Sequence, residues 1–449
     1  MAEMVLAMGI PGKRSVEEAS YLLKRLYLVE RETMRTLGGY LVNVADWNLK
    51  TQLPRHIWQD AQRADALRTR ILELRYPKRD VDQEHDEDLL AVLNLLIRCK
   101  GDAELLEGIY FVVKRALAHA YSIYLETADL LDDAPTVSLI RRFIPEIKEQ
   151  IHDAVELKAQ LETRQRRDAG HAQTTDEGEW RYFLMDSLRR IGGVLGSNKD
   201  RVKSPGAASN VSIEADPLLA VRPPYEPPLV PVRDPRFAEA RYHYPIRPVS
   251  KFIERQVYAA INHVNEIWAA EIPALVMWRW NDMPWDFYLD CARWAYDESR
   301  HCLMGVRRLQ AWGFEIGIDY PVIADHYLAV SGQGELAVLA LLHAFEVNGP
   351  YWKSQMKTEF ENQGDTSSSQ DFDYDWADES IHLAYGHKWV LHRLKGDMDA
   401  LEDLKEQVMD DWNKWVAQAR AVWDYEPFLS RIDARIAAIE GEPNGSRHG

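Results

Sequence analysis

The sequence predicts an all-α fold in which a four-helix bundle is preceded by a second helical domain. Apolar residues recur at helical spacing over most of the chain, and alternating strand-like runs between tight-turn dipeptides are nearly absent. At 449 residues the chain is too long for one ordinary core, which suggests two domains. Apolar residues make up 46% of the chain, enough for a sizeable core in each.

The N-terminal helical domain is expected over residues 1–165. Its first helix begins at Ser15, where the capping box Ser-Val-Glu-Glu precedes an apolar-periodic segment that runs to residue 44. Proline and aspartate turns then separate further helices, with Pro145 expected in the first turn of the last one. These helices are predicted at about 55–75, 84–99, 102–131 and 145–165.

A proline-rich linker is predicted over residues 166–248, because ten of the 21 prolines lie between Pro205 and Pro248. Such a density prevents long helices and favours an extended chain, which the apolar residues of the segment should hold against a surface. The four-helix bundle is predicted over residues 249–395, followed by a C-terminal helical tail over residues 396–449. The helices of the bundle are expected near 249–281, 285–313, 334–361 and 371–395.

Two copies of the pattern Asp-Glu-Ser-x-His, at 297–301 and 378–382, are the most informative motif. The i, i+3 spacing puts the glutamate and the histidine on one helix face, so that both can reach the same ion. A single Glu-x-x-His would also suit an ordinary surface ion pair. The repeat with shared residues favours metal binding by Glu298 and His301 on one helix and by Glu379 and His382 on another.

Two further glutamates lie inside apolar helical stretches, where an unpaired charge would be expensive: Glu346 in LLHAFEVN and Glu271 in AAEIPALVMW. The resulting order of Glu, Glu-x-x-His, Glu, Glu-x-x-His over four consecutive helices is that of the ferritin-like di-iron and di-manganese proteins. Glu266 competes with Glu271 for the first position. On one continuous helix the two residues lie about 140° apart and cannot both face the site. The apolar face that follows Glu271 favours Glu271.

With these motifs the chain resembles the family of the domain of unknown function 455, ferritin-like proteins related to a tRNA hydroxylase that acts on a modified adenosine. The resemblance covers roughly residues 220–395. It is carried by Pro223-Pro224-Tyr225-Glu226-Pro227, residues 263–271, Phe287-Tyr288-Leu289-Asp290 and the two Asp-Glu-Ser-x-His motifs. It implies two metal ions held by Glu271, Glu298, His301, Glu346, Glu379 and His382.

Asp297 and Asp378 directly precede the two motif glutamates and lie about 100° round the helix from them. Each could accept a hydrogen bond from a histidine on a neighbouring helix, which would orient that imidazole as a ligand. The alternative is a solvent-facing carboxylate. Arg293, Arg300 and His343 are expected to serve helix packing or ion pairs.

The N-terminal half contains a damaged version of the same plan. Three of its four elements have counterparts, in Glu30, Glu126 and Glu149 with His152. Where a Glu-x-x-His should stand, the second helix offers Asp60, Arg63 and Asp65, so that a cation takes an expected ligand position. This half would hold at most a weak or single-ion site. The favoured alternative is a metal-free bundle that supports the active one.

The ligand set predicts an oxygen-activating di-iron oxidoreductase that hydroxylates, desaturates or otherwise oxidises a small organic substrate. Its cofactors would be two iron ions, with manganese or a mixed pair as alternatives, and dioxygen would be the co-substrate. An electron-donor protein is expected as a partner, and a homodimer is an open option. The alternative functions are a ferroxidase or other metal-handling protein and a non-catalytic helical scaffold.

The formal charge of −17 argues against nucleic acid as a partner. No apolar run approaches the roughly 20 residues that cross a bilayer, and the N-terminus does not read as a signal peptide. Three scattered cysteines indicate a reducing compartment. We therefore expect a cytoplasmic protein with no membrane partner.

Overall fold

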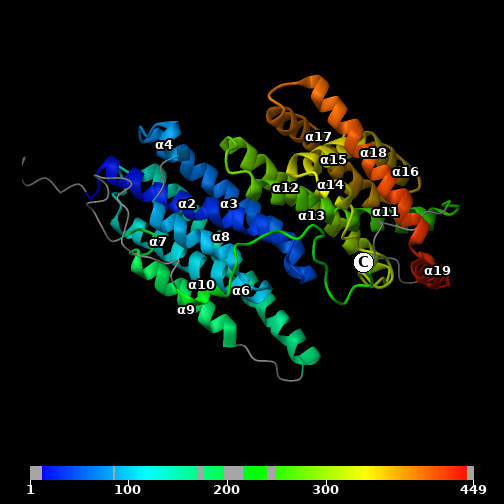
Figure 1. Cartoon of the computed structure of the whole chain (residues 1–449), viewed down its shortest axis with the longest axis horizontal. Helices are drawn as coiled ribbons and strands as arrows, with labels where there is room; N and C mark the ends of the chain where they lie inside the picture. Colours follow the sequence, from blue (N-terminus) through cyan, green and yellow to red (C-terminus); the bar gives the residue numbers. More distant parts are fainter. Residues whose placement is uncertain (1–12, 84–85, 170–174, 197–215, 240–247, 442–449) are drawn as a thin grey trace, which may run out of the picture. The chain divides into compact units, whose positions relative to one another are not determined.

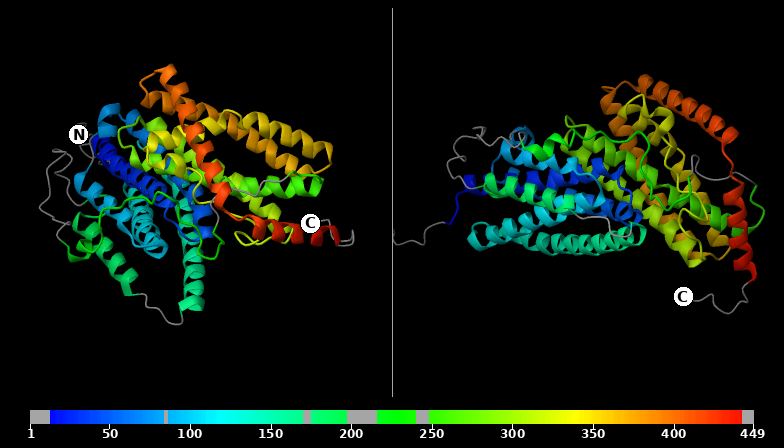
Figure 2. Two further views of the ribbon diagram at one scale, coloured as in Figure 1. Left: turned by 45° about the vertical axis from the view of Figure 1, so that its right-hand side comes forward. Right: turned by 60° about the horizontal axis from the view of Figure 1, so that its bottom comes forward.

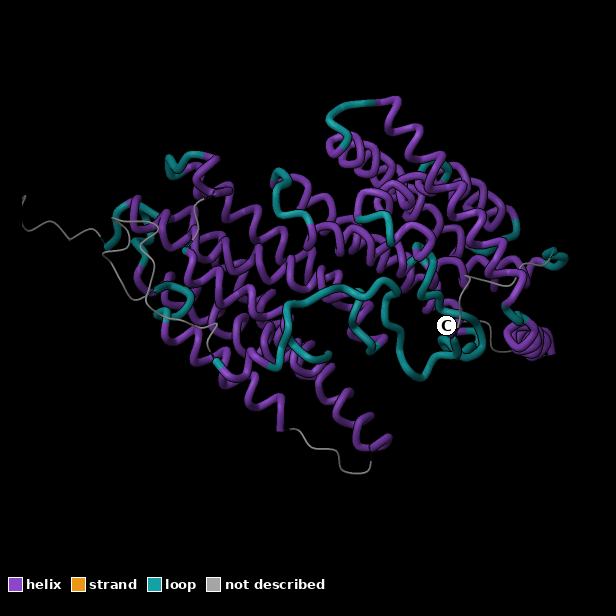
Figure 3. The backbone as a smooth tube through the Cα atoms, viewed as in Figure 1, coloured by secondary structure: helices purple, strands orange, loops and turns teal. Residues whose placement is uncertain are grey.

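The computed structural model describes residues 13–83, 86–169, 175–196, 216–239 and 248–441. Within these ranges the chain is helical and has no strand, which confirms the predicted all-α fold (Figures 1 and 3). None of the helices in these ranges is both long and apolar enough to cross a bilayer. The chain divides into two compact units: unit 1 is residues 1–36 with 59–225, and unit 2 is residues 37–58 with 226–449.

Unit 1 contains the first part of α2 (Val16–Leu41) and the last part of α3 (Trp47–Glu73). The helices that lie wholly within it can be followed by colour from blue to green in Figure 2. They are α4 (Lys78–Gln83), α5 (Glu87–Leu95), η1 (Leu96–Arg98), α6 (Asp102–Leu106), the π-helix η2 (Glu107–Lys114), α7 (Arg115–Thr127), α8 (Ala134–Ala169), α9 (Thr175–Arg190) and α10 (Pro217–Ala220).

The longest helix of unit 1 starts earlier than predicted. α8 begins at Ala134, and Pro145 lies inside it rather than in its first turn. An internal proline removes one helical hydrogen bond. The buried stripe of Ile140, Phe143 and Ile147 nevertheless runs straight past this position. Burial of a continuous apolar face therefore outweighs the local cost of the proline.

The predicted linker contains a helix that the proline argument did not anticipate. α9 occupies residues 175–190 and buries Trp180, Leu184 and Leu188, which recur every four residues on one helix face. The prolines begin only at Pro205, so their density says nothing about this earlier segment.

Residues 226–239 run as irregular chain against other parts of unit 2. The amide of Val232 donates a hydrogen bond to the carbonyl of Val42 over 2.7 Å. The ring of Phe237 meets that of Trp47 edge-on, with 5.4 Å between centroids. This part of the proline-rich segment thus lies against a surface, as its apolar residues indicated.

The described residues of unit 2 form four helical arms and a C-terminal pair of helices. The first arm, α11 with α12, packs on the second, α13, and the third arm, α15 with α16, packs on the fourth, α17. Contacts of α12 with α15 and of α13 with α17 close the bundle. The helices are α11 (Phe252–Asn265), α12 (Ile267–Arg279), α13 (Trp285–Ala311), α14 (Leu328–Ser331), α15 (Glu335–Glu346), α16 (Gly349–Asn362), α17 (Thr366–Arg393), α18 (Met398–Val422) and α19 (Glu426–Gly441).

Two of the four arms are broken where the sequence predicted single helices. Glu266 lies between α11 and α12, and its ψ of −3° interrupts the helical run. The third arm breaks after Glu346, and α16 starts at Gly349. A glutamate thus lies at the first break and directly before the second.

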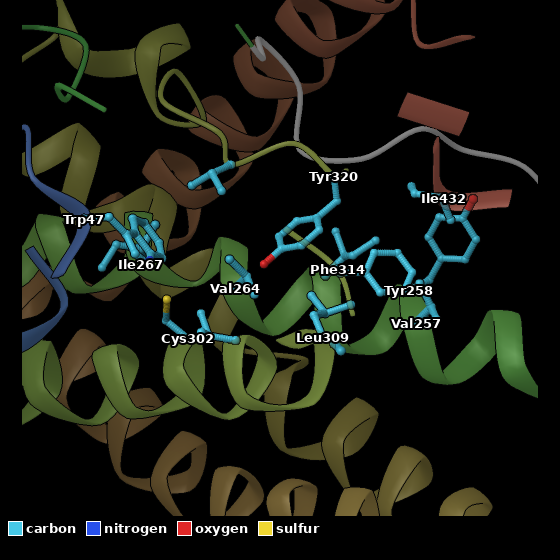
Figure 4. Packing of buried hydrophobic residues seen from close by; sticks show 14 of the residues in the cluster. Trp47, Val257, Tyr258, Val264, Ile267, Cys302, Leu309, Phe314, Tyr320 and Ile432 are labelled. Carbon is cyan, nitrogen blue, oxygen red and sulfur yellow. The ribbon is translucent and has the colours of Figure 1, made fainter. Parts of the chain in front are cut away.

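An apolar cluster holds α11 against α13 (Figure 4). Gly305 allows the two helices to approach closely, because a Cβ there would overlap the carbonyl oxygen of Ala260. The members from these helices and from the segments that cover them include Val257, Ile261, Val264, Cys302, Val306, Leu309, Phe314, Tyr320, Ile432 and Ile436. Since Cys302 follows His301 directly, this packing also fixes the position of a predicted ligand.

Candidate metal centre

Two overlapping groups of ligand-type atoms meet in the bundle of unit 2, and we call them together the metal centre. The first ion site comprises Glu266, His301, Asp375 and Glu379, and the second ion site comprises Glu298, Glu346, Glu379 and His382. Within each group the ligand atoms lie within 4.8 Å of one another. Glu379 belongs to both groups and is therefore placed to bridge two ions.

The first ion site is centred on Nδ1 of His301. Glu266 Oε2 lies 3.3 Å from this nitrogen, Glu298 Oε2 lies 3.4 Å away and Asp375 Oδ1 lies 3.5 Å away. Nδ1 of His301, Oε2 of Glu266 and Oδ1 of Asp375 are buried and have no hydrogen-bond partner. Buried polar atoms are rarely left unpaired. A convergent set of unpaired ligand atoms fits a bound cation.

The second ion site is more enclosed. His382 Nδ1 lies 3.0 Å from Glu298 Oε1 but in a direction that makes no hydrogen bond. Trp294 donates its indole N–H to the same Glu298 oxygen over 3.2 Å, and its ring stacks on His382. Gly349 lets α16 start beside Glu379, because a Cβ at this position would overlap a carboxylate oxygen of Glu379.

The two motif aspartates lie opposite the histidines of the other motif. Asp378 Oδ2 is 3.2 Å from His301 Nε2, and Asp297 Oδ2 is 3.5 Å from His382 Nε2. Asp378 is hydrogen-bonded to Nε2 of His301, whereas Asp297 lies near Nε2 of His382 without a hydrogen bond, and Nδ1 of each imidazole lies among the carboxylates of the metal centre. A carboxylate in that position orients a ligating histidine and increases its basicity.

Two arginines balance the charge of these aspartates. Arg293 donates to Asp297 over 2.6 Å, and Arg300 donates to Asp297 over 2.8 Å and to Asp378 over 3.0 Å. The prediction that Arg293 and Arg300 form ion pairs is confirmed. The two aspartates and two arginines are neutral together, so they leave the charge of the metal centre unchanged.

The metal centre itself has an excess of negative charge. It contains five carboxylates and two imidazoles, and the ammonium of Lys353 is the cation in direct contact with it among the described residues. With every carboxylate ionised and both imidazoles neutral, the net charge is four negative, which two divalent ions would neutralise. Buried charge of this size needs counter-charge.

The pKa values respond to this excess. Burial opposes ionisation of Glu298, but His301 and His382 hold its pKa at about 2. Burial, together with the neighbouring Glu379 and Glu298, raises the pKa of Glu346 well above its usual value. Burial favours the neutral form of His382, yet Asp297 and Glu298 raise its pKa to about 9. Without ions, protons supply the missing positive charge.

Comparison with known families gives a match over the same part of the chain. Residues 216–435 match a family described as a protein of unknown function (DUF455). The C-terminal half of the chain belongs to the DUF455 family. The match includes every residue of the metal centre. Neither the curated proteins nor the solved structures contain a match to the chain.

Within the DUF455 region, the structure brings together five of the six residues expected as ligands and places Glu271 elsewhere. Glu271 forms ion pairs with Lys50 and with Arg233. The guanidinium of Arg233 donates to the two carboxylate oxygens of Glu271 over 2.7 and 2.9 Å. The preference for Glu271 over Glu266 assumed one continuous helix. The break at Glu266 instead puts this residue at the metal centre, with Oε2 next to His301.

Two functional candidates of the DUF455 region were not identified from the sequence. Asp375 lies four residues before Glu379, and this spacing puts both carboxylates on one face of α17. That spacing could have revealed it. Lys353 gave no comparable signal, because a single lysine on an amphipathic helix is ordinary. Only the bundle geometry brings its ammonium to Glu266 and Asp375.

The N-terminal candidates are placed differently from the expected degenerate site. Glu126, Glu149 and His152 are exposed, and His152 pairs with Glu156. Glu30 is buried, in a group that we call the ion-pair cluster of unit 1: Glu30, Asp60, Arg63, Lys114, Tyr121 and Gln150. The inward residue on α8 is Gln150, one position from Glu149, and a shift of one residue turns a helical side chain by about 100°.

Proposed function

We propose that the DUF455 region is a ferritin-like domain that binds two iron ions and uses dioxygen to oxidise a small organic substrate. The observation that carries the proposal is that five carboxylates and two imidazoles converge in the bundle. Several of their buried ligand atoms have no hydrogen-bond partner. Mixed carboxylate and imidazole ligation suits iron and manganese. Calcium and magnesium would favour all-oxygen sites, and zinc is commonly held by fewer ligands.

The proposed roles of the residues follow from their positions. Glu379 would bridge the ions, since it belongs to both groups. Glu298, which lies close to both histidines, is a second candidate bridge. His301 and His382 would each bind one ion through Nδ1, with Asp378 accepting the Nε2 proton of His301 and Asp297 lying 3.5 Å from Nε2 of His382. Seven protein ligands for two ions leave coordination positions free for dioxygen or substrate.

Access to the metal centre would be from the side of Glu266 and Lys353. Their side chains are 12% and 11% exposed, whereas those of His301, His382 and Asp375 are fully buried. On the enclosed side, the ring of Trp294 stacks on the imidazole of His382, which is fully buried. A small molecule could thus approach one edge of the centre while the other edge stays dry.

When bound, the two iron ions would supply electrons to dioxygen, which could then attack an unreactive bond. Hydroxylation of a C–H bond by dioxygen also produces one water and consumes two external electrons and two protons. A separate electron donor is therefore part of the proposal. The chain's own contribution is to hold the ligands, fix the histidine protons and limit access.

The test is iron binding and oxygen uptake after anaerobic loading with Fe(II). We expect about two irons per chain in the wild type and oxygen uptake when air is admitted, both lost in Glu298→Ala. The control is Glu361→Ala, which removes an exposed glutamate paired with Lys357 on α16 and should change neither. Absence of iron from the wild type would contradict the proposal. Oxygen uptake that stops once the loaded iron is oxidised, even with a reductant present, would indicate ferroxidase chemistry instead.

A further inference from the structure

We infer that Lys353 is a positioning residue of the metal centre, which directs one oxygen of Glu266 and one of Asp375 at the first ion site and favours the reduced ion there. The inference rests on the proposed function, because it concerns the same centre. It adds that the two ion sites are unequal, and that the lysine makes them so.

The carboxylate oxygens around Lys353 divide into an outer and an inner set. Its ammonium contacts Oε1 of Glu266 at 2.5 Å and Oδ2 of Asp375 at 2.7 Å. The oxygens that face His301 are the other two, Oε2 of Glu266 and Oδ1 of Asp375, and these have no hydrogen-bond partner. Lys353 thus occupies the outer oxygens and leaves one oxygen of each carboxylate for an ion.

A histidine completes the support of Asp375. His263 Nε2 lies 2.7 Å from the same outer oxygen, Oδ2, that Lys353 contacts. The ring of His263 is buried and packs on Phe372 at 4.3 Å between centroids. These two contacts on Oδ2 hold the carboxylate of Asp375 in one orientation, so that it would bind an ion through Oδ1 alone.

Among the residues that the structure describes, the second ion site has no ammonium closer than 3.8 Å to a ligand. The position that corresponds to Asp375 in the first Asp-Glu-Ser-x-His motif, four residues before the glutamate, is Trp294. An indole and an imidazole therefore stack at the second site, where the first has a carboxylate paired with a lysine. Lys353 reaches the shared Glu379 only at 3.8 Å.

A fixed positive charge beside one site favours the lower oxidation state of the ion in that site. Net charge is one of the properties through which a protein sets the potential of bound iron. With Lys353 present, two Fe(II) ions make the centre neutral, and oxidation of either adds positive charge. The ion in the first site would feel this cost most, because Lys353 contacts two of that site's ligands directly.

The experiment compares Lys353→Met, Lys353→Arg and Lys357→Met with the wild type. Lys357 is the matched control: it lies one turn further along α16 and pairs with Glu361 at the surface. Each protein is loaded anaerobically with Fe(II) and poised at a series of potentials. Iron per chain is measured, and Mössbauer spectra give the ratio of ferric to ferrous iron for each of the two sites.

We expect about two irons per chain throughout. At a fixed potential, Lys353→Met should raise the ferric to ferrous ratio of one site by about tenfold, equivalent to about 59 mV for a one-electron couple. Lys353→Arg and Lys357→Met should stay close to the wild type. If Lys353→Met folds poorly, Lys353→Gln replaces it, since an amide keeps a hydrogen-bond donor while removing the charge.

The results distinguish this inference from the proposed function. Two irons with an unchanged ratio in Lys353→Met would overturn the role of Lys353 and leave the proposed function intact. Equal changes at both sites would overturn the claim that the sites are unequal. No iron in the wild type would remove the proposed function and this inference together.

Discussion

The two units each bury carboxylates between helices, but they neutralise the charge in different ways. In the ion-pair cluster of unit 1, Glu30 and Asp60 are matched by the guanidinium of Arg63 and the ammonium of Lys114. In the metal centre of unit 2, five carboxylates meet one lysine. The ion-pair cluster of unit 1 thus carries its own cations, whereas the metal centre of unit 2 has an excess of four negative charges.

Hydrogen bonding separates the two regions in the same way. Glu30 accepts from Arg63 and Tyr121, and Asp60 accepts from Lys114, Arg63 and Gln150. No side-chain atom of these residues is both buried and unpaired among the residues that the structure describes. The metal centre instead contains several unpaired ligand atoms. A cluster of buried charged residues can therefore have all its polar atoms paired or leave some unpaired, and only a cluster with unpaired atoms indicates a ligand.

The largest effect should come from the shared ligand of the metal centre. Glu379→Ala removes a carboxylate from both ion sites, so we expect bound iron to fall from about two per chain to well below one. Metal analysis after gel filtration measures this. A matched change in unit 1, Glu30→Gln, should leave bound iron unchanged, and loss of iron in that variant would show that the two regions are not independent.

The strongest effect on stability should come from the opposite region. Arg63→Met leaves Glu30 and Asp60 buried beside Lys114 alone, which should destabilise the protein by about 3–5 kcal/mol. Urea denaturation measures the free energy of unfolding. Iron content of the folded protein should stay the same. A variant that gained iron would contradict the view that unit 1 is complete without an ion.

A pair of glutamates tests which member of the first arm binds an ion. Glu266→Gln should lower bound iron to about one per chain with little effect on stability. Glu271→Gln should retain both irons but destabilise the protein by roughly 3 kcal/mol, because Lys50 and Arg233 lose a buried partner. Metal analysis and urea denaturation of both variants decide the matter. Loss of iron in Glu271→Gln but not in Glu266→Gln would support Glu271 as the ligand, as the sequence predicted.

A smaller, pH-dependent effect should come from a histidine outside the metal centre. Burial lowers the pKa of His343 to about 4, in contrast to the raised pKa of His382. The imidazole of His343 therefore binds a proton less readily in the folded than in the unfolded state. As pH falls from about 6.5 towards 4, this lowers the free energy of unfolding by an amount on the order of 2 kcal/mol. His343→Gln should flatten the loss of stability over this range in thermal melts of the metal-free protein, whereas an unchanged slope would exclude His343 as its source.

Much of the fold and the site could be predicted from local sequence. Helix starts and the long apolar stripes depend on nearby residues, so the all-α fold followed from periodicity. The repeated Asp-Glu-Ser-x-His motif fixed the relative directions of Glu298 and His301 and of Glu379 and His382 within single helices. The repeat also predicted that the aspartate of each motif can reach a histidine on a neighbouring helix.

The rest depended on features that arise only in three dimensions. The break at Glu266 reverses the choice between two glutamates five residues apart, and no proline or glycine marks it. Lys353 acquires its role from the packing of α16 on α17. In unit 1, a one-residue difference in helix phase puts Gln150 inside and Glu149 outside. Helix phase and helix breaks were therefore the limiting uncertainties.

The most direct test of the account is a crystal structure of the protein loaded anaerobically with Fe(II), with anomalous scattering measured at the iron edge. We predict two iron peaks in unit 2, roughly 3.5–4 Å apart as in other two-metal sites, on either side of Glu379. One should contact Glu266, His301 and Asp375, and the other Glu298, Glu346 and His382. No peak at these positions, or a peak in the ion-pair cluster of unit 1, would contradict the account.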